Sequence, residues 1–182
     1  MTDAVVIYRS KYGSARKYAE WIAESLNASL FECSTVNASD LTSFNTIVYG
    51  GGLYAGGLNG ISFIERNFKY LQDKNLILFT CGIADPQNQT NKEHIQQNIS
   101  RALSPSMMKK IKVFSLRGGI DYQRLSFVHR VMMGALRRTL LRKKTEDLTE
   151  EDRQLLDTYG GAIDFVNKAS IDPILEYVHS LR

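Results

Sequence analysis

Apolar and polar residues follow two periods along this chain of 182 residues. Apolar runs bounded by turn residues predict five strands, at 4–8, 30–33, 46–49, 76–81 and 111–116; those at 4–8 and 76–81 are expected to be buried, and the one at 30–33 is short and weaker. Apolar residues at helical spacing predict helices between them, at 15–26, 61–71 and 91–103. Two more helices are expected, one at about 149–167, where Thr149 and Asp152 suit a helix start, and one at about 174–181.

This alternation is typical of an α/β fold, in which a doubly wound parallel sheet carries helices on both faces. We find no internal repeat and no linker, so we expect residues 1–182 to form a single domain. In such sheets, ligands bind outside the carboxyl ends of the strands. Three polar or glycine-rich turns follow three predicted strands, at 9–15, 50–57 and 81–88, and we expect the functional site there.

The first of these turns has the composition of an anion cradle. Ser10 and Ser14 supply hydroxyls, and Gly13 allows a tight backbone path. The amides at the start of the next helix favour an anion. The turn lacks the signatures of a P-loop and of a dinucleotide site, so a monophosphate is the expected ligand. The alternative is an ordinary strand-to-helix turn with Ser14 as the helix cap.

The other two turns suit a flat ligand. Residues 50–57 contain five glycines, which let a backbone approach a ring closely, and Leu53 and Tyr54 are placed to lie against its face. The alternative is a flexible loop with Tyr54 as a surface aromatic. Residues 81–88 contain no aromatic side chain, which leaves one face of such a ligand open. Asp85 is expected either to contact the ligand or to cap its own loop.

The motifs SKYGSA at 10–15, GGGLYAGG at 50–57 and TCGIADP at 80–86 resemble the phosphate loop and the two flavin-ring loops of flavodoxins. The resemblance covers most of the chain and implies a flavodoxin-like, five-stranded sheet in the order 2-1-3-4-5 that binds FMN noncovalently. The residues that it implies at FMN are Ser10, Lys11, Tyr12, Gly13, Ser14, Ala15, Gly51, Gly52, Leu53, Tyr54, Ala55, Gly56, Cys81, Gly82, Ile83 and Asp85. Ala15 departs from the pattern, because flavodoxins usually have threonine there, and implies one phosphate contact fewer.

A second resemblance lies further along the chain. The segment RGGIDYQRLSFVHRVMMGALRR, at 117–138, is similar to one in the menaquinone-dependent protoporphyrinogen oxidases. These are flavodoxin-fold enzymes with an insert before the final helix. The matching residues are Gly118, Gly119, Tyr122, Met132 and Met133. The resemblance implies a basic helical insert at about 120–148 and an FMN-dependent oxidoreductase, although loop 50–57 differs from that family's longer one.

The basic charge of the chain is concentrated in one segment. Residues 117–144 hold eight basic residues against Asp121, a net charge of +7, whereas the whole chain carries +4. At helical spacing, one face of this segment is apolar, with Leu125, Val128, Met132, Ala135, Leu136 and Leu140. Another face carries arginines, Arg130, Arg137, Arg138 and Arg142, with Phe127, Val131 and Leu141 among them.

This basic helix has three interpretations. In the first, it packs on the sheet edge with a solvated basic face. In the second, it docks an acidic redox partner protein. In the third, it lies on an anionic membrane surface where a quinone is within reach. No nucleic-acid-reading module is visible, so nucleic acid is not an expected partner.

Other features of the sequence bear on membrane insertion, metal binding and localisation. No apolar run is long enough to span a membrane, and Ala4–Tyr8 is expected to be a buried strand rather than a signal peptide. Cys33 and Cys81 match no metal spacing and are expected to be reduced thiols. We therefore expect a cytoplasmic protein, or one peripheral to the inner face of the membrane. The three histidines, His94, His129 and His179, are expected to be structural or on the surface.

Two main function classes stay open at this point. One is an FMN-dependent oxidoreductase acting on a flat, anionic small molecule, and the other is an electron carrier that serves a partner reductase. A scaffold that has lost its flavin is a third class, which the substitution at Ala15 motivates.

Overall fold

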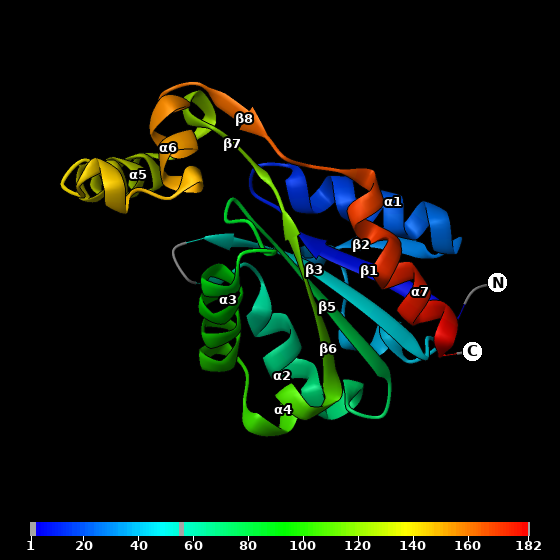
Figure 1. Cartoon of the computed structure of the whole chain (residues 1–182). Helices are drawn as coiled ribbons and strands as arrows, with labels where there is room; N and C mark the ends of the chain where they lie inside the picture. The colour runs from blue at the N-terminus through cyan, green and yellow to red at the C-terminus, as the bar shows by residue number, and fades with distance from the viewer. Residues whose placement is uncertain (1–2, 55–56, 182) are drawn as a thin grey trace.

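A parallel sheet forms the centre of the computed structural model, which describes residues 3–54 and 57–181 (Figure 1). Its strand order is β2-β1-β3-β5-β6. These strands are β1 (Ala4–Arg9), β2 (Ser29–Glu32), β3 (Thr46–Tyr54), β5 (Asn75–Gly82) and β6 (Ile111–Arg117). The short β4 (Gly57–Leu58) pairs antiparallel with the end of β3. Apart from β4, the order along the chain is 2-1-3-4-5, which confirms the predicted topology.

Helices cover both faces of the sheet (Figure 1). One face carries α1 (Ser14–Leu26) and α7 (Asp172–Ser180). The other carries three helices, α2 (Ile61–Leu71), α3 (Gln89–Ala102) and α4 (Pro105–Lys110). Alternate strand residues belong to the two cores, so a strand buried on both faces is apolar throughout. This explains why continuous apolar runs located the strands.

The glycine-rich segment was predicted as a turn, and that prediction is wrong for its first part. β3 does not end at Tyr49 but continues through the glycines to Tyr54. A Cβ atom at Gly50 would lie 1.9 Å from Cζ of Phe79, so this glycine makes room for a ring of the neighbouring strand. Ala55 and Gly56, which were expected at the ligand, lie outside the described residues.

An insert leaves the sheet between β6 and α7 (Figure 1). It begins with β7 (Gly119–Asp121), which pairs antiparallel with β8 (Ala162–Asp164), the strand that brings the chain back. Between them lie α5 (Phe127–Leu140) and α6 (Glu150–Asp157), which stand apart from the sheet. The segment predicted at 120–148 is therefore the first part of a longer excursion.

The helix predicted at 149–167 is confirmed at its start and wrong at its end. Thr149 and Asp152 form a capping box at the start of α6. The helix ends at Asp157, and Gly160 follows with a φ of +89°, a left-handed conformation that glycine adopts most readily. The chain then returns to the sheet, and α7 is the last helix on it.

α5 does not pack on the sheet edge as the first interpretation of the basic segment expected. Leu140 is its one buried residue within the part of the chain described. Four residues of its predicted apolar face are exposed, Val128, Met132, Ala135 and Leu136. The reason is the place of α5 at the far end of the β7–β8 hairpin, where there is no sheet face to cover it. Across residues 3–54 and 57–181, no helix has both the length and the apolar character to cross a membrane.

Replacing Gly50 by alanine should destabilise the fold strongly. The added Cβ would overlap the Phe79 ring, which is fully buried and has little room to move. We expect a loss of about 3 kcal/mol in the free energy of unfolding, measured by urea denaturation. Gly134→Ala is the control, because its Cβ would lie 3.5 Å from the Tyr159 hydroxyl and alanine favours a helix. Equal stability of the two variants would contradict the packing role of Gly50.

Candidate functional site

The turn between β1 and α1 is built to leave helix amides free. Gly13 is the N-cap of α1 with a φ of +102°, and no side chain caps the first turn. Its amide donates to Ser10 Oγ at 3.1 Å, which shapes the turn. A Cβ at Gly13 would meet no described residue within 4 Å, so that part of the structure leaves the space beside the turn open. Uncapped amides at a helix start are a site for an anion.

Ser14 joins this turn to the insert rather than capping the helix. Its Oγ accepts a hydrogen bond from the Gly119 amide at 3.2 Å. A Cβ at Gly118 would lie 2.9 Å from Cys81 Sγ and 3.3 Å from Ser14 Cβ. The start of α1, the end of β5 and the exit of β6 therefore meet at one point of the sheet edge.

A pocket of about 300 Å³ lies at this junction. The sheet edge supplies one side of it, with Tyr12, Ser14, Ala15, Leu53, Tyr54, Cys81, Gly82 and Ile83. The insert supplies the rest, with Gly118, Gly119, Ile120, Leu125, His129, Met132, Met133 and Leu136. A second pocket of about 430 Å³ adjoins it, sharing Tyr12 and Ser14 and adding Gly13, Lys17 and Arg124.

The start of α5 is bonded to the first turn. Tyr12 Oη lies 2.6 Å from His129 Nδ1 and accepts a hydrogen bond from the Ser126 amide at 3.2 Å. Lys11 Nζ donates to Ser126 Oγ at 3.2 Å. The Tyr54 ring packs against both rings, with its centroid 5.3 Å from that of His129 and 5.4 Å from that of Tyr12. These contacts hold the insert over the turn.

The same contacts shift the titration of the Tyr12–His129 pair. Burial lowers the pKa of His129, and the Lys11 ammonium adds to this effect. Burial alone would raise the pKa of Tyr12, but hydrogen bonds with Ser126 and the charge of Lys11 outweigh it, and the pKa is lowered. A neutral His129 can accept the Tyr12 proton at Nδ1, so the pair is able to hold and move a proton at the pocket wall.

Cys81 also lines the pocket, but its thiol is not a nucleophile there. Burial raises the pKa of Cys81 to about 12, and the nearby Asp164 charge adds to the rise. The thiol therefore stays protonated at neutral pH and acts as a small apolar contact.

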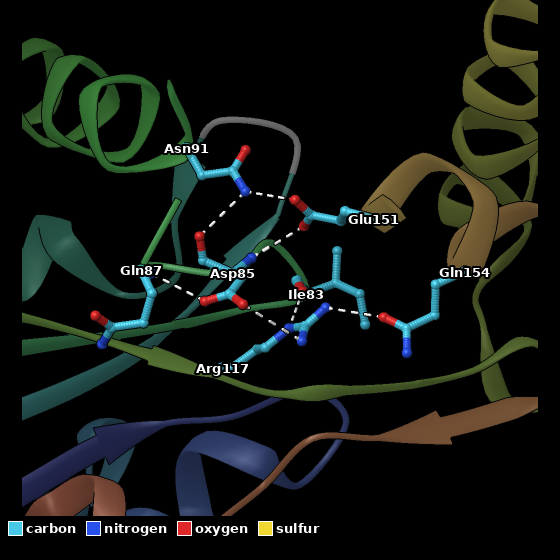
Figure 2. Close-up of polar contacts among 7 residues, drawn as sticks. All are labelled: Ile83, Asp85, Gln87, Asn91, Arg117, Glu151 and Gln154. Carbon is cyan, nitrogen blue, oxygen red and sulfur yellow. Dashed lines mark hydrogen bonds and ion pairs between the residues drawn. The ribbon is translucent and has the colours of Figure 1, made fainter. Parts of the chain in front are cut away.

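The loop after β5 is held from the insert side, as Figure 2 shows. Glu151 of α6 accepts hydrogen bonds from the Asp85 amide at 3.0 Å and from Asn91 Nδ2 at 2.6 Å. Arg117 Nε donates to the Ile83 carbonyl at 3.1 Å. The guanidinium of Arg117 also stacks on Phe165, with Cζ 3.4 Å from the ring centroid. The insert thus fixes the loop that supplies Ile83 to the pocket.

Not every predicted residue lies in the pocket. Asp85 does not line it, because its carboxylate accepts a hydrogen bond from the Gln87 amide and faces Arg117, which is the loop-capping alternative. Gly51 and Gly52 are buried within β3. Ser10 and Lys11 shape and brace the first turn without lining the pocket.

The sequence interpretation missed part of the site. His129 was expected to be structural or on the surface, yet it lines the pocket and bonds Tyr12. The signal was present, because Leu125, His129, Met132 and Leu136 recur at spacings of one helical turn. Tyr122, by contrast, packs against Tyr159 and lies outside the pocket.

Removing the Glu151 carboxylate should loosen the loop after β5. In Glu151→Ala, the Asp85 amide and the Asn91 side chain lose their acceptor, at a cost of about 1–3 kcal/mol for local closure. We expect the Asp85 amide to exchange its hydrogen at least about tenfold faster, measured by hydrogen–deuterium exchange. Glu150→Ala is the matched control, since that side chain is 91% exposed and, within residues 3–54 and 57–181, pairs only with Arg153. Unchanged exchange at Asp85 in Glu151→Ala would show that the insert does not hold the loop.

Comparisons with known proteins give a family match and distant structural similarities. The "Flavodoxin domain" family model Flavodoxin_5 matches residues 5–149. No curated protein sequence matches significantly. Among solved structures, oxidised flavodoxin 2 from Bacillus cereus is 13% identical over 85% of this chain and 92% of its own, with a TM-score of 0.44. A flavoprotein from Lactobacillus acidophilus, solved in complex with FMN, is 14% identical over 64% of this chain and 93% of its own, with a TM-score of 0.43. Because the family model spans most of the chain, this protein belongs to the flavodoxin-domain family.

Proposed function

We propose that the protein binds FMN and acts as an oxidoreductase on a flat, largely apolar small molecule held beneath α5. The observation that carries this proposal is the side of α5 that lines the pocket, opposite the residues of the sheet edge. His129, Met132, Met133 and Leu136 form a wall across the pocket, whereas a carrier needs an open edge for a partner protein. A pocket enclosed mostly by apolar groups, with a few polar ones, is typical of a small-molecule site.

The residues at the first turn fit the phosphate of FMN. The leading amides of α1 are uncapped, and Gly13 leaves open space beside them. The hydroxyl hydrogens of Ser10 and Ser14 have no acceptor among the described residues, so both can donate to a phosphate oxygen. Lys17 lines the adjoining pocket and adds positive charge. Ala15 supplies no hydroxyl, so the amides and the two serines would carry the binding.

The residues around the 300 Å³ pocket fit the flavin ring. Leu53 and Tyr54 would lie on one side of it, and Cys81, Gly82 and Ile83 on another. Bound FMN would supply the redox chemistry, by taking up electrons from one reactant and passing them to another. The chain itself would orient the reactants and exclude water through its apolar wall, and the Tyr12–His129 pair would hold a proton beside them.

The adjoining pocket offers basic groups to an anionic substrate, with Lys17 and Arg124 beside the acidic Asp121 and Asp164. Arg124 lines it and makes no hydrogen bond or ion pair with any described residue, so its charge is available. Lys17 lies 4.0 Å from Asp164 and is only partly neutralised by it. Together with the resemblance of residues 117–138, this supports oxidation of a porphyrinogen, whose carboxylates would face Arg124, with a quinone as acceptor.

An electron carrier is the second candidate. Membership of the flavodoxin-domain family favours it, and so do the exposed basic residues at the end of α5, which suit an acidic redox partner. A carrier would deliver electrons to a protein and would form no product of its own.

The phosphate assignment is tested by Ser14→Asp. The new carboxylate still accepts from the Gly119 amide and favours the helix start, but it would repel a phosphate bound there. At a separation of about 5 Å in partly buried surroundings, this repulsion is worth about 3 kcal/mol. We expect the affinity for FMN, measured by fluorescence quenching, to fall at least about a hundredfold, with that for riboflavin unchanged because it lacks phosphate. An equal loss of both flavins would place the phosphate elsewhere.

The two function classes are separated by one assay. Protein loaded with FMN is mixed with protoporphyrinogen IX and menadione without oxygen, and porphyrin fluorescence is followed. We expect porphyrin to form faster than with free FMN at the same concentration, and Met133→Trp to slow it by filling the pocket beside the flavin. No formation above the free-FMN rate, together with rapid reduction of cytochrome c by the reduced protein, would reject the oxidase and favour the carrier.

A further inference from the structure

One face of α5 exposes large apolar side chains to solvent. Phe127 is 80% exposed, Val128 is 63% exposed, and Val131 and Leu141 are each 56% exposed. We call these four residues the outward face of α5. They stand in contrast to Leu140, which is 4% exposed at the other side of the same helix. Exposed apolar groups gathered in this way mark an interaction site more often than scattered ones do.

The outward face is separate from the pocket wall. Successive residues of an α-helix are rotated by about 100°, which places His129, Met132 and Leu136 on one side of α5. Phe127 and Val131 then lie on the opposite side, and Arg138 falls between them around the helix. The exposures agree, because Met132 and Leu136 are 37% and 39% exposed and the outward residues are far more so. The pocket therefore gives no reason for these apolar side chains.

Positive charge surrounds the outward face. Residues 127–144 contain six basic residues and no acidic one. Arg137 lies over the Tyr159 ring and Lys143 pairs with Asp152, so these two are engaged within the protein. Arg138 and Arg142 are exposed, and their side chains have no hydrogen bond, ion pair or ring contact with residues 3–54 or 57–181. Their charges are free to meet an anionic surface.

We propose that the outward face of α5 binds the surface of an anionic lipid bilayer. Phe127, Val128 and Val131 enter the boundary between headgroups and acyl chains, and Arg138 and Arg142 contact lipid phosphates. Large apolar side chains interleaved with arginines on one helix are what an interfacial helix requires. A second copy of the chain fits poorly, because it would bring the same positive charge to the same face.

This inference does not depend on flavin binding, although it has a consequence for the proposed function. The same helix presents its inner side to the pocket, so bilayer contact would place the pocket beside the membrane surface. A lipophilic reactant would then reach the site without crossing water.

The test is co-sedimentation of the full-length protein with vesicles. We expect binding to vesicles of phosphatidylcholine with phosphatidylglycerol, and little binding to phosphatidylcholine alone. Phe127→Ser with Val131→Ser, and Arg138→Glu with Arg142→Glu, should each weaken binding at least about tenfold. Raised salt should weaken it as well.

Two control variants match these changes elsewhere on the surface. Tyr70→Ser removes an exposed aromatic on α2, and Lys109→Glu with Lys110→Glu makes the same change in net charge on α4. Both should bind vesicles as the wild type does, and the flavin content of all variants should be equal.

Several results would overturn the proposal. These are no binding to anionic vesicles, equal weakening by the control variants, or a self-associating wild type whose dimer is lost in the Phe127 variant. Loss of flavin with vesicle binding intact would count against the proposed function and leave the membrane surface assignment standing.

Discussion

The site depends on the close approach of three segments at Gly118. A side chain there would collide with Cys81 Sγ and press on Ser14, so β5, β6 and the start of α1 meet only because this residue is glycine. The next amide, that of Gly119, then bonds Ser14 Oγ and sets the direction in which the insert leaves the sheet. If these three segments lay further apart, β7 would move away from α1, and the pocket that both elements line would become wider. The path by which the insert leaves the sheet thus follows from a contact at the sheet edge.

The insert is held at two further places, and each serves the pocket. The Tyr12–His129 contact holds the start of α5 over the first turn. The bonds of Glu151 to the Asp85 amide and Asn91 hold α6 against the loop after β5. α5 is consequently fixed with one side toward the pocket and the opposite side toward solvent. A helix fixed in this way can close a small-molecule site and present a docking surface at the same time.

Much of the fold was predictable because its causes are local. A strand buried on both faces is a continuous apolar run, and α2 was located at 61–71 from its spacing alone. The first turn was also recognisable, because a helix start with glycine and serines has its chemistry in adjacent residues. Gly160 likewise carried a local signal for the end of α6, which the predicted helix at 149–167 overlooked.

The remaining features depend on contacts between distant residues. Gly50 was taken for part of a loop, but its role is to admit Phe79 from the neighbouring strand. Asp85 is turned away from the pocket by Arg117 and by its own loop, and Glu151, which bonds its amide, lies 66 residues further on. His129 is held at the pocket by its contact with Tyr12, 117 residues away. The periodic apolar residue Val128 is exposed, because none of the described elements covers that side of α5. No local pattern contains these partners.

The central claim is that the sheet edge and the insert form one flavin pocket. A crystal structure of the protein grown with FMN tests it most directly. The account predicts the phosphate at the leading amides of α1 and the flavin ring beneath α5, next to Cys81 and Ile83. A flavin bound elsewhere, or crystals without flavin at saturating FMN, would contradict it.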